Sequence, residues 1–288
     1  MKVAFSPHEL GGGERAVALG TFDGVHLGHR WVIDAALAAG PQAAVVTFDP
    51  HPRVALGNRV ELISTLERRL ELIESLGVTE TLVVPFTPDL ALRTPEEFAR
   101  SFLEPVGARV VVAGANFRFG RGRSGDLALL GELGFDARPV PLVEGVSSSR
   151  IRQLAGAGEV GRAAKLLGRP VEVEGTVVAG DARGGTLGFP TANLAVPADL
   201  LVPAFGIYAG EALGKRTATS IGVNPHYGGE ERRIEAFLLD YEGDLYGQRL
   251  VVELWERLRE ERSFDSEGDL IEQIGRDVEA ARAAVRPA

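Results

Sequence analysis

The stretch GTFDGVHLGH, residues 20–29, decides how the first half of this chain folds. It follows an apolar run, Ala16 to Leu19, and precedes a helix-like run from Trp31 to Ala39. Its glycines, its carboxylate and its two imidazoles therefore lie on a turn between a strand and a helix. A helix N-terminus leaves backbone N–H groups unpaired and carries positive partial charge, so this turn is expected to attract phosphate.

His26 and His29 lie three residues apart, which on a helix places them on one face. Such a pair also occurs as two metal ligands or as two unrelated surface residues. Zinc would need further ligands, and the chain has no cysteine and only His8, His51 and His226 besides this pair. The surrounding glycines and aspartate favour phosphate chemistry. The pair resembles the HxGH signature of nucleotidyltransferases, in which a nucleophile attacks the α-phosphate of a nucleoside triphosphate and pyrophosphate leaves.

The composition is that of an ordinary globular protein of one or two domains: 288 residues, 45% apolar and 25% charged. No apolar run approaches the roughly 20 residues of a membrane span, and residues 1–15 lack the apolar core of a signal peptide. The absence of cysteine suggests a reducing cytoplasm. The net charge of −9 argues against broad nucleic-acid binding.

Lysine usage excludes one kind of phosphate-binding loop. The only lysines are Lys2, Lys165 and Lys215, and none is followed by serine or threonine. A P-loop of the form GxxxxGK[ST] is therefore absent. Any kinase activity of this chain must bind phosphate in another way.

The first half alternates strand-like and helix-like segments, which predicts a parallel, doubly wound α/β sheet. The expected strands are residues 43–48, 81–85 and 109–113. One helix is expected over residues 64–76, with Leu66, Leu70, Ile73 and Leu76 on one face, and another is expected to begin at Thr94. Ligands of such sheets bind at the carboxyl ends of the strands, which is where residues 20–29 fall.

The pattern changes after about residue 155. A glycine-containing connector and a short helix, residues 160–167, precede segments that alternate with period two. Residues 171–174, 234–240 and 249–254 read as strands, and residues 242–244 as a turn between the last two. An antiparallel sheet or barrel is expected here, followed by a helix that Ser266 caps and whose stripe is Leu270, Ile271, Ile274, Val278 and Ala281.

Three further segments of the first half carry polar residues after strands or at a helix start. TFDPHP, residues 47–52, is either site-like or a structural turn. GANFRFGRGR, residues 114–123, suits a phosphate-binding loop because guanidinium groups bind phosphate in bidentate fashion, although a solvated basic loop would look similar. SSSRIR, residues 147–152, begins a helix that could hold an anion, and an ordinary serine cap is the alternative.

Together, GTFDGVHLGH, TFDPHP, GANFRFGRGRSGD and SSSRIR resemble, in order, the FMN adenylyltransferase half of the prokaryotic bifunctional riboflavin kinase/FMN adenylyltransferase (FAD synthetase) family. The match covers most of residues 16–155. The resemblance implies that His26 and His29 stabilise charge on the transferring and leaving phosphates. It implies flavin contacts from Phe48 and Pro50, and ATP and phosphate contacts from Gly20, Phe22, Asp23, Gly24, Gly28, Asn116, Arg118, Ser148, Ser149 and Arg152.

The second half contains a glycine-rich loop, residues 180–188, followed by the sequence FPTAN. Its backbone could approach phosphates closely, although a glycine-rich hairpin is the plainer reading. Thr191 and Asn193 are alternate residues, so in an extended segment their oxygens point the same way. Hard oxygen ligands beside a polyphosphate suit Mg²⁺.

The stretch GFPTAN, residues 188–193, resembles the signature of riboflavin kinase. The later segments GIY (206–208), IGVNP (221–225), IEAFLLD (234–240), YG (246–247) and LREERSF (258–264) follow in the family's order. The resemblance implies that Glu235 is the general base for the ribityl hydroxyl, and that Thr191 and Asn193 hold Mg²⁺ with ATP. It also implies phosphate contacts from Gly180 and Gly188 and flavin contacts from Tyr208, Arg259 and Phe264.

Three positions depart from the family's pattern. Gly185 stands where arginine is common, and Ser220 and His226 replace the usual asparagine and threonine around the IGxxPT segment. None of the three is a proposed magnesium ligand or base. They bear on the affinity for flavin or nucleotide more than on the reaction type.

The sequence therefore predicts an α/β plus β protein. A Rossmann-like HxGH nucleotidyltransferase domain, residues 1–167, precedes a Greek-key antiparallel β-barrel riboflavin kinase domain with a C-terminal helix, residues 168–288. The expected function is phosphorylation of riboflavin to FMN by ATP with Mg²⁺, then adenylylation of FMN to FAD. The expected partners are riboflavin, FMN and ATP, without nucleic acid or membrane, for a cytoplasmic monomer or weak homo-oligomer.

Three alternatives remain open at this point. The chain could retain only one of the two activities. It could instead be another HxGH nucleotidyltransferase, such as a cytidylyl- or pantetheine-phosphate adenylyltransferase with an appended β domain, although the GFPTAN loop argues against this. It could also be a flavin-binding or regulatory protein without catalysis, although the histidine pair and Glu235 both favour an enzyme.

Overall fold

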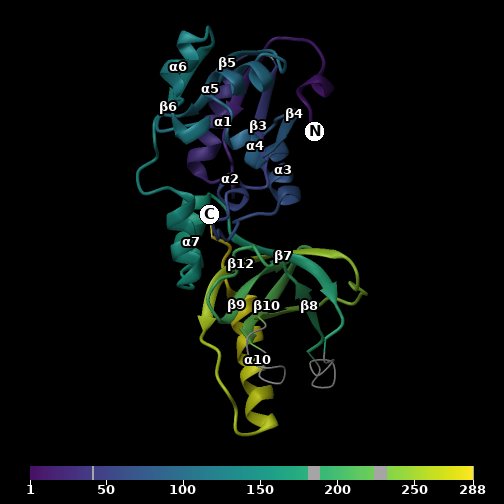
Figure 1. The fold of residues 1–288 in the computed structure, drawn as a ribbon. Helices are drawn as coiled ribbons and strands as arrows, with labels where there is room; N and C mark the ends of the chain where they lie inside the picture. Colours follow the sequence, from purple (N-terminus) through teal and green to yellow (C-terminus); the bar gives the residue numbers. More distant parts are fainter. Residues whose placement is uncertain (41, 181–188, 224–231, 288) are drawn as a thin grey trace. The chain divides into compact units, whose positions relative to one another are not determined.

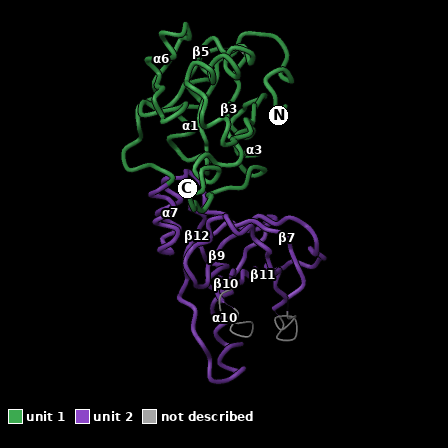
Figure 2. The backbone as a smooth tube through the Cα atoms, in the orientation of Figure 1, with its two compact units in different colours: residues 1–148 green, residues 149–288 purple. Residues whose placement is uncertain are grey.

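The computed structural model describes residues 1–40, 42–180, 189–223 and 232–287. The chain forms two compact units, Met1–Ser148 (unit 1) and Ser149–Ala288 (unit 2), which Figure 2 colours separately. Each unit is described by itself. The sequence predicts a domain boundary after residue 167 instead. The units reflect which segments pack together and do not show which segments fold independently, so that boundary stays a prediction.

Unit 1 is built on the predicted parallel sheet. Its six strands are arranged in the order β1-β4-β3-β2-β5-β6, and every neighbouring pair is parallel (Figure 1). They are β1 (Lys2–Ala4), β2 (Arg15–Leu19), β3 (Ala43–Asp49), β4 (Glu80–Pro85), β5 (Ala108–Gly114) and β6 (Asp136–Val140). The central strand β2 is buried along its whole length, and its carboxyl end leads directly into residues 20–29.

The two faces of this sheet bury alternate residues of the same strands. Ala16 and Ala18 of β2 belong to one apolar cluster, which includes Ile33 and Ile73 from two helices. Val17 and Leu19 belong to the cluster on the other face. Both faces are therefore covered, as in a doubly wound α/β fold.

The helices of unit 1 follow the predicted order. They are η1 (Pro7–Leu10), α1 (Leu27–Ala39), α2 (Pro52–Ala55), α3 (Leu66–Ser75), α4 (Pro88–Ala91), α5 (Pro95–Phe98), the π-helical turn η2 (Ala99–Leu103), η3 (Arg121–Arg123) and α6 (Leu127–Glu132). The predicted apolar face of α3 is confirmed in part: Ile73 is buried, Leu76 packs against the same cluster, and Leu66 and Leu70 are partly buried. The buried residues of α3 are Arg69, Leu72 and Ile73, so an arginine occupies a core position.

Unit 2 contains the predicted antiparallel barrel, whose closed strand order is β10-β11-β8-β7-β12-β9 (Figure 1). Its strands are β7 (Val171–Val178), β8 (Thr191–Ala195), β9 (Gly206–Ala212), β10 (Lys215–Val223), β11 (Arg232–Leu238) and β12 (Arg249–Arg259). Because β8 pairs with β11 and β12 returns to β7, the order is that of a Greek key and not of a simple meander. Three of these strands, β7, β11 and β12, were predicted. β7 and β12 are longer than expected, and β11 begins and ends two residues earlier than expected.

Among the described residues of unit 2, helices lie before and after the barrel strands. The helix α8 (Val160–Leu167) packs on β7 and β12, α10 (Glu267–Ala283) packs on β9, β10 and β12, and α7 (Ser148–Gly156) precedes them in the chain. The Ser266 hydroxyl accepts a bond from the Asp269 N–H and caps α10, as the sequence predicts. The buried residues of α10 are Asp277 and Ala281, of which Ala281 belongs to the predicted stripe, whereas Ile271 of that stripe is exposed.

Candidate functional site

The turn after β2 is held in an unusual backbone conformation. Phe22 and Val25 have positive φ values of 50° and 39°, which cost free energy in non-glycine residues and persist only where the surroundings enforce them. Gly24 has φ +78°, and a Cβ there would lie 2.6 Å from Ile63 Cγ2. Only glycine therefore fits at this position without displacing the neighbouring segment.

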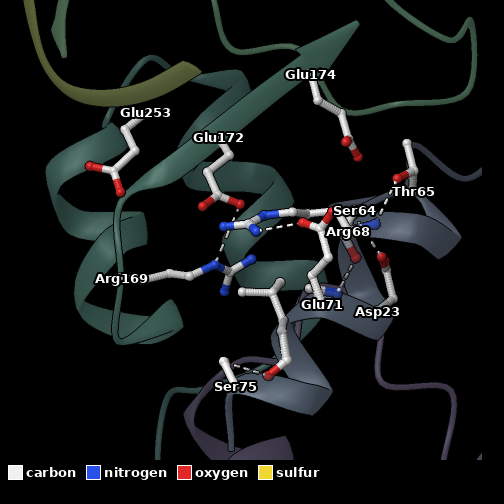
Figure 3. A network of polar contacts seen from close by, with 12 residues as sticks. Asp23, Ser64, Thr65, Arg68, Glu71, Ser75, Arg169, Glu172, Glu174 and Glu253 are labelled. Carbon is white, nitrogen blue, oxygen red and sulfur yellow. Dashed lines mark hydrogen bonds and ion pairs between the residues drawn. The ribbon is translucent and has the colours of Figure 1, made fainter. Parts of the chain in front are cut away.

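Asp23 fastens this turn to the segment before α3. Its buried carboxylate oxygen Oδ1 accepts the backbone N–H of Ile63 at 2.9 Å. It also accepts the backbone N–H of Ser64 at 3.3 Å, and Figure 3 shows Asp23 next to Ser64. In return the Gly24 N–H donates to the Ser64 hydroxyl at 3.1 Å. Asp23, predicted to bind ATP or phosphate, thus has a structural role as well. Its contact with a nucleotide stays a prediction.

His26 and His29 lie at the start of α1 with their rings stacked, 3.5 Å between centroids and 14° between planes. His26 is the N-cap residue, and its Nδ1 accepts the backbone N–H of His29 at 3.2 Å. Because Nδ1 is the acceptor, the neutral His26 ring carries its proton on Nε2. The Phe22 ring meets His29 edge-on at 5.3 Å. The pair is therefore fixed in place and can present N–H donors at a helix N-terminus.

The loop after β3 lies beside this turn, because β2 and β3 are parallel neighbours. The buried Thr47 hydroxyl donates to the Thr21 carbonyl at 3.0 Å. Phe48 is buried against other phenylalanine rings, whereas Pro50 is exposed. Of the two residues predicted to contact flavin here, Pro50 presents the accessible surface. Pro52 starts α2 at its first position, where proline is tolerated.

Arg69 is the residue of this site that the sequence did not reveal. It is 1% exposed, and its Nη1 donates to the Thr21 carbonyl at 2.9 Å and to the Phe48 carbonyl at 3.0 Å. Its Nη2 reaches Asp49 Oδ1 at 3.3 Å. Burial lowers the pKa of Arg69, and the carboxylates of Asp23 and Asp49 oppose that shift. A strongly basic guanidinium so surrounded by acceptors remains charged.

The arginine-containing loop after β5 lies open to solvent. Asn116 and Arg118 are both exposed, and Arg118 forms an ion pair with Asp126, which caps α6. The Leu129 backbone N–H and then Arg118 lower the pKa of the Asp126 carboxyl. Arg118 must leave this pair to bind phosphate, and its predicted role remains a prediction.

The serine-containing segment begins α7, as the sequence predicts. The Ser148 hydroxyl donates to the Asp23 carbonyl at 3.4 Å, which connects Ser148 to the histidine-bearing turn within unit 1. Ser149 and Arg152 belong to unit 2. Their contribution to a phosphate site stays a prediction.

In unit 2 the predicted base and a predicted metal ligand lie opposite each other in the barrel. Glu235 of β11 pairs in register with Asn193 of β8. Arg233, two residues before Glu235 on β11, contacts both side chains. Its Nε donates to Asn193 Oδ1 at 3.2 Å and lies 2.5 Å from Glu235 Oε1. Arg233 was not predicted. It could have been noticed because it shares the outward face of β11 with Glu235 by the period of two.

Thr191 lines a pocket of about 330 Å³ in unit 2. Apolar and aromatic neighbours, Pro190, Leu238, Tyr241 and Tyr246, form much of its wall. The pocket suits a planar, partly apolar group beside a hydroxyl-lined polar edge. Elsewhere in unit 2, a Cβ at Gly180 would lie 2.3 Å from Asn193 Nδ2, so a larger residue there would displace the Asn193 side chain.

The predicted flavin contacts of unit 2 differ in accessibility. Arg259, at the end of β12, lies 5.8 Å from the centre of the partly buried Phe264 ring. Tyr208 has no exposed surface, and its hydroxyl donates to the Ala204 carbonyl. Burial raises the pKa of Tyr208 to about 12. Direct flavin contact by Tyr208 stays a prediction.

Some predicted positions lie outside the described residues: Gly188, and the departures Gly185 and His226. Ser220 is described, on β10 opposite Glu235 of β11.

Within the described part of the chain, no group of three or more histidine, aspartate or glutamate side chains could hold a metal ion. No helix of the described residues has the length and apolar character to cross a membrane.

Comparison with known proteins assigns a family to each half. The FAD synthetase family model matches residues 12–150, and the riboflavin kinase family model matches residues 167–285. Two curated relatives, the bifunctional riboflavin kinase/FMN adenylyltransferases of Listeria monocytogenes and Bacillus subtilis, are each 36% identical. The alignments cover 93% and 96% of this chain, and 92% and 95% of the relatives.

A further curated relative is the Escherichia coli bifunctional riboflavin kinase/FMN adenylyltransferase, 34% identical over 92% of this chain and 91% of its own. A crystal structure described as a macrolide-efflux protein from Streptococcus pneumoniae superposes with a TM-score of 0.86 at 32% identity, over 98% of this chain and 99% of that one. The fold is thus shared along the whole length. The chain belongs to the bifunctional riboflavin kinase/FMN adenylyltransferase family.

Proposed function

We propose that this chain makes FAD from riboflavin in two ATP-dependent steps, one in each unit. Unit 2 transfers the γ-phosphoryl group of ATP to the ribityl hydroxyl, giving FMN and ADP. Unit 1 joins FMN to the adenylyl group of a second ATP, giving FAD and pyrophosphate. The observation that carries this proposal is that the two family matches fall on two compact units, each with its own predicted polar site.

In unit 1, an FMN phosphate oxygen attacks the α-phosphorus of ATP, and the bond to the bridging oxygen of pyrophosphate breaks. His26 and His29 act as donors to the phosphate oxygens on which charge grows, since the N-cap bond leaves the neutral His26 proton on Nε2. The free N–H groups at the start of α1 add positive partial charge. No covalent intermediate on the protein is needed, because FMN already carries the nucleophile.

In unit 2, the Glu235 carboxylate takes the proton of the ribityl hydroxyl as its oxygen attacks the γ-phosphorus of ATP. Glu235 is well suited to this role because the strand pairing with Asn193 fixes its backbone. Arg233 lies against the same carboxylate and supplies a cation close to the reacting phosphate.

The donor set of unit 2 fits a magnesium ion carried by ATP. Thr191 and Asn193 offer neutral oxygens from one face of β8, and Mg²⁺ commonly takes one or two protein ligands together with substrate phosphates. Asn193 Oδ1 accepts a bond from Arg233 in this structure, so Arg233 would have to turn away for the ion to bind there. The ion would neutralise phosphate charge during transfer. The pocket beside Thr191 would take the adenine ring.

The test is a chromatogram of the products formed from riboflavin, ATP and Mg²⁺. FMN should appear first, and FAD should follow with an equal amount of pyrophosphate. Formation of FMN without FAD would support the kinase activity and reject the adenylyltransferase activity. The absence of both products would reject the whole proposal. Sedimentation of the same sample tests our further proposal that the chain is a monomer or weak homo-oligomer.

A further inference from the structure

We propose that Arg69 is a positioning residue for adenylyl transfer, which clamps together the two loops that follow β2 and β3. This proposal rests on the proposed function of unit 1 and adds a residue to it. Arg69 does not touch a substrate in the proposed mechanism. It acts through the backbone of the loops that carry the predicted site residues.

The contacts of Arg69 fall on both loops at once. One nitrogen, Nη1, donates to the Thr21 carbonyl of the first loop and the Phe48 carbonyl of the second, at 2.9 and 3.0 Å. The other, Nη2, pairs with Asp49 at 3.3 Å. A planar guanidinium can bind several acceptors at fixed angles, which a lysine ammonium cannot do in the same way. The two loops are therefore connected through a single rigid group.

The same segment also holds the turn from its other side. Ile63 and Ser64, a few residues before Arg69, donate backbone N–H groups to Asp23. Figure 3 shows Asp23 and Ser64 side by side. Thr47 adds a direct bond between the loops by donating to the Thr21 carbonyl. The turn thus has one set of bonds at Thr21 and another at Asp23, on either side of Phe22.

A clamp is needed here because the turn is strained. Phe22 and Val25 have positive φ values, and this backbone would relax to a more common conformation if its restraints were removed. The stacked histidines come directly after Val25, so relaxation would move both rings. A displacement of about 1 Å can lower a rate by roughly a hundredfold. Loss of the clamp should therefore reduce turnover more than nucleotide affinity.

Arg15 offers a matched control in the same unit. It is also an almost fully buried arginine, with Glu80 at 2.7 Å and backbone carbonyls of residues 10 and 106 as partners. It lies at the amino end of β2, whereas Arg69 contacts the carboxyl ends of β2 and β3. If buried arginines matter only for stability, Arg15→Ala and Arg69→Ala should behave alike.

The experiment compares Arg69→Ala, Arg69→Lys and Arg15→Ala in the full chain, at a temperature where melting curves show each variant folded. For Arg69→Ala we expect kcat for FMN adenylylation to fall at least about tenfold with little change in KM for ATP. Arg69→Lys should retain part of the activity. Riboflavin phosphorylation should be unchanged, and Arg15→Ala should keep adenylylation within about threefold of wild type.

Two further measurements separate positioning from folding. Methylguanidinium should restore part of the adenylylation activity of Arg69→Ala and none in Arg15→Ala. Amide hydrogen exchange of residues 21–25 should quicken in Arg69→Ala alone. Wild-type kcat in folded Arg69→Ala, an equal loss in Arg15→Ala, or unchanged exchange in the turn would overturn the proposal. If Arg69→Ala does not fold, Arg69→Lys decides by the same criteria.

The outcome also distinguishes the clamp from the proposed function. If the wild-type chain formed FMN but no FAD, the adenylylation proposal would fail. The exchange measurement does not depend on activity, so it would still show whether Arg69 restrains the turn.

Discussion

Asp277 on α10 holds Arg259 at the end of β12 through a two-pronged ion pair. Arg259 Nε lies 3.0 Å from Asp277 Oδ1, and Nη2 lies 2.7 Å from Oδ2. Asp277 is 6% exposed, and Gln273 Nε2 also donates to its Oδ1 at 2.8 Å. The C-terminal helix therefore orients Arg259, which the family resemblance predicts to contact the flavin.

Replacing Asp277 with asparagine should weaken both stability and flavin binding. The amide keeps one oxygen acceptor but turns an NH₂ group toward the guanidinium, so we expect the free energy of unfolding of unit 2 to fall by about 2 kcal/mol. Arg259 would no longer be held in one orientation, so we expect weaker flavin binding and a higher KM for riboflavin. Denaturant unfolding followed by circular dichroism, together with kinase assays, measures both effects.

Asp240→Asn is the matched control for this prediction. Asp240 also joins α10 to the barrel region, through Arg282, but both side chains are largely exposed. Solvent screens such pairs, so stability and KM should both stay at wild-type values. Equal behaviour of the two variants would show that the buried position of Asp277 has no special role.

His29→Ala should abolish FAD formation while FMN formation persists. Removing one preorganised donor to a developing phosphate charge typically lowers kcat by a factor of about a hundred or more. Product chromatography with riboflavin, and separately with supplied FMN, distinguishes the two steps. His8→Ala, at an exposed position of η1, serves as the control and should leave both activities intact. Unchanged FAD synthesis in His29→Ala would remove the histidine from the proposed site.

Much of the fold follows from local patterns. The strand and helix around residues 20–29 were predictable because a continuous apolar run, a glycine-containing turn and an amphipathic run each have a clear signature. The C-terminal helix was predictable from its serine cap. The helix α1 nevertheless begins at Leu27, earlier than the apolar pattern indicated, because His26 itself acts as the cap.

The residues that support the sites were not predictable, because their roles depend on contacts distant in sequence. Arg69 reads as a surface residue of an amphipathic helix, yet its partners lie 20 to 48 residues away. Asp277 lies next to the apolar stripe of α10, and the sequence alone does not indicate that it pairs with Arg259. Pairing in register also decides that Glu235 faces Asn193, and register between separate strands cannot be read from either strand alone.

Glu235→Gln should stop FMN formation but leave the adenylylation of supplied FMN intact. Glutamine has nearly the same shape and cannot accept the hydroxyl proton, so we expect kcat of the kinase step to fall by a factor of about 10² to 10⁴. Glu256→Gln, at an exposed position of β12, is the control for a strand glutamate outside the site. Persistent riboflavin phosphorylation in Glu235→Gln would exclude this residue as the base.

Tyr208 should make unit 2 sensitive to alkaline pH. Burial raises the pKa of its hydroxyl from an ordinary value of 10.0 to about 12, so the unfolded chain loses this proton at a lower pH than the folded chain. The folded state binds more protons in that interval, and stability therefore falls as pH rises from about 10 to about 12. Below pH 10 both states are protonated and the group adds no pH dependence.

The expected size of this effect is about 2.7 kcal/mol over the whole interval, from a shift of about two pKa units. Tyr208→Phe should be less stable at neutral pH, because the bond to the Ala204 carbonyl is lost, and should show a flatter stability curve between pH 10 and 12. Tyr246→Phe, at a position 64% exposed, should keep the wild-type slope. Denaturant unfolding of the three proteins at pH 9 to 12 tests this prediction. If the free energy of unfolding has the same slope against pH in wild type and Tyr208→Phe, the Tyr208 hydroxyl ionises in the folded barrel as readily as in water.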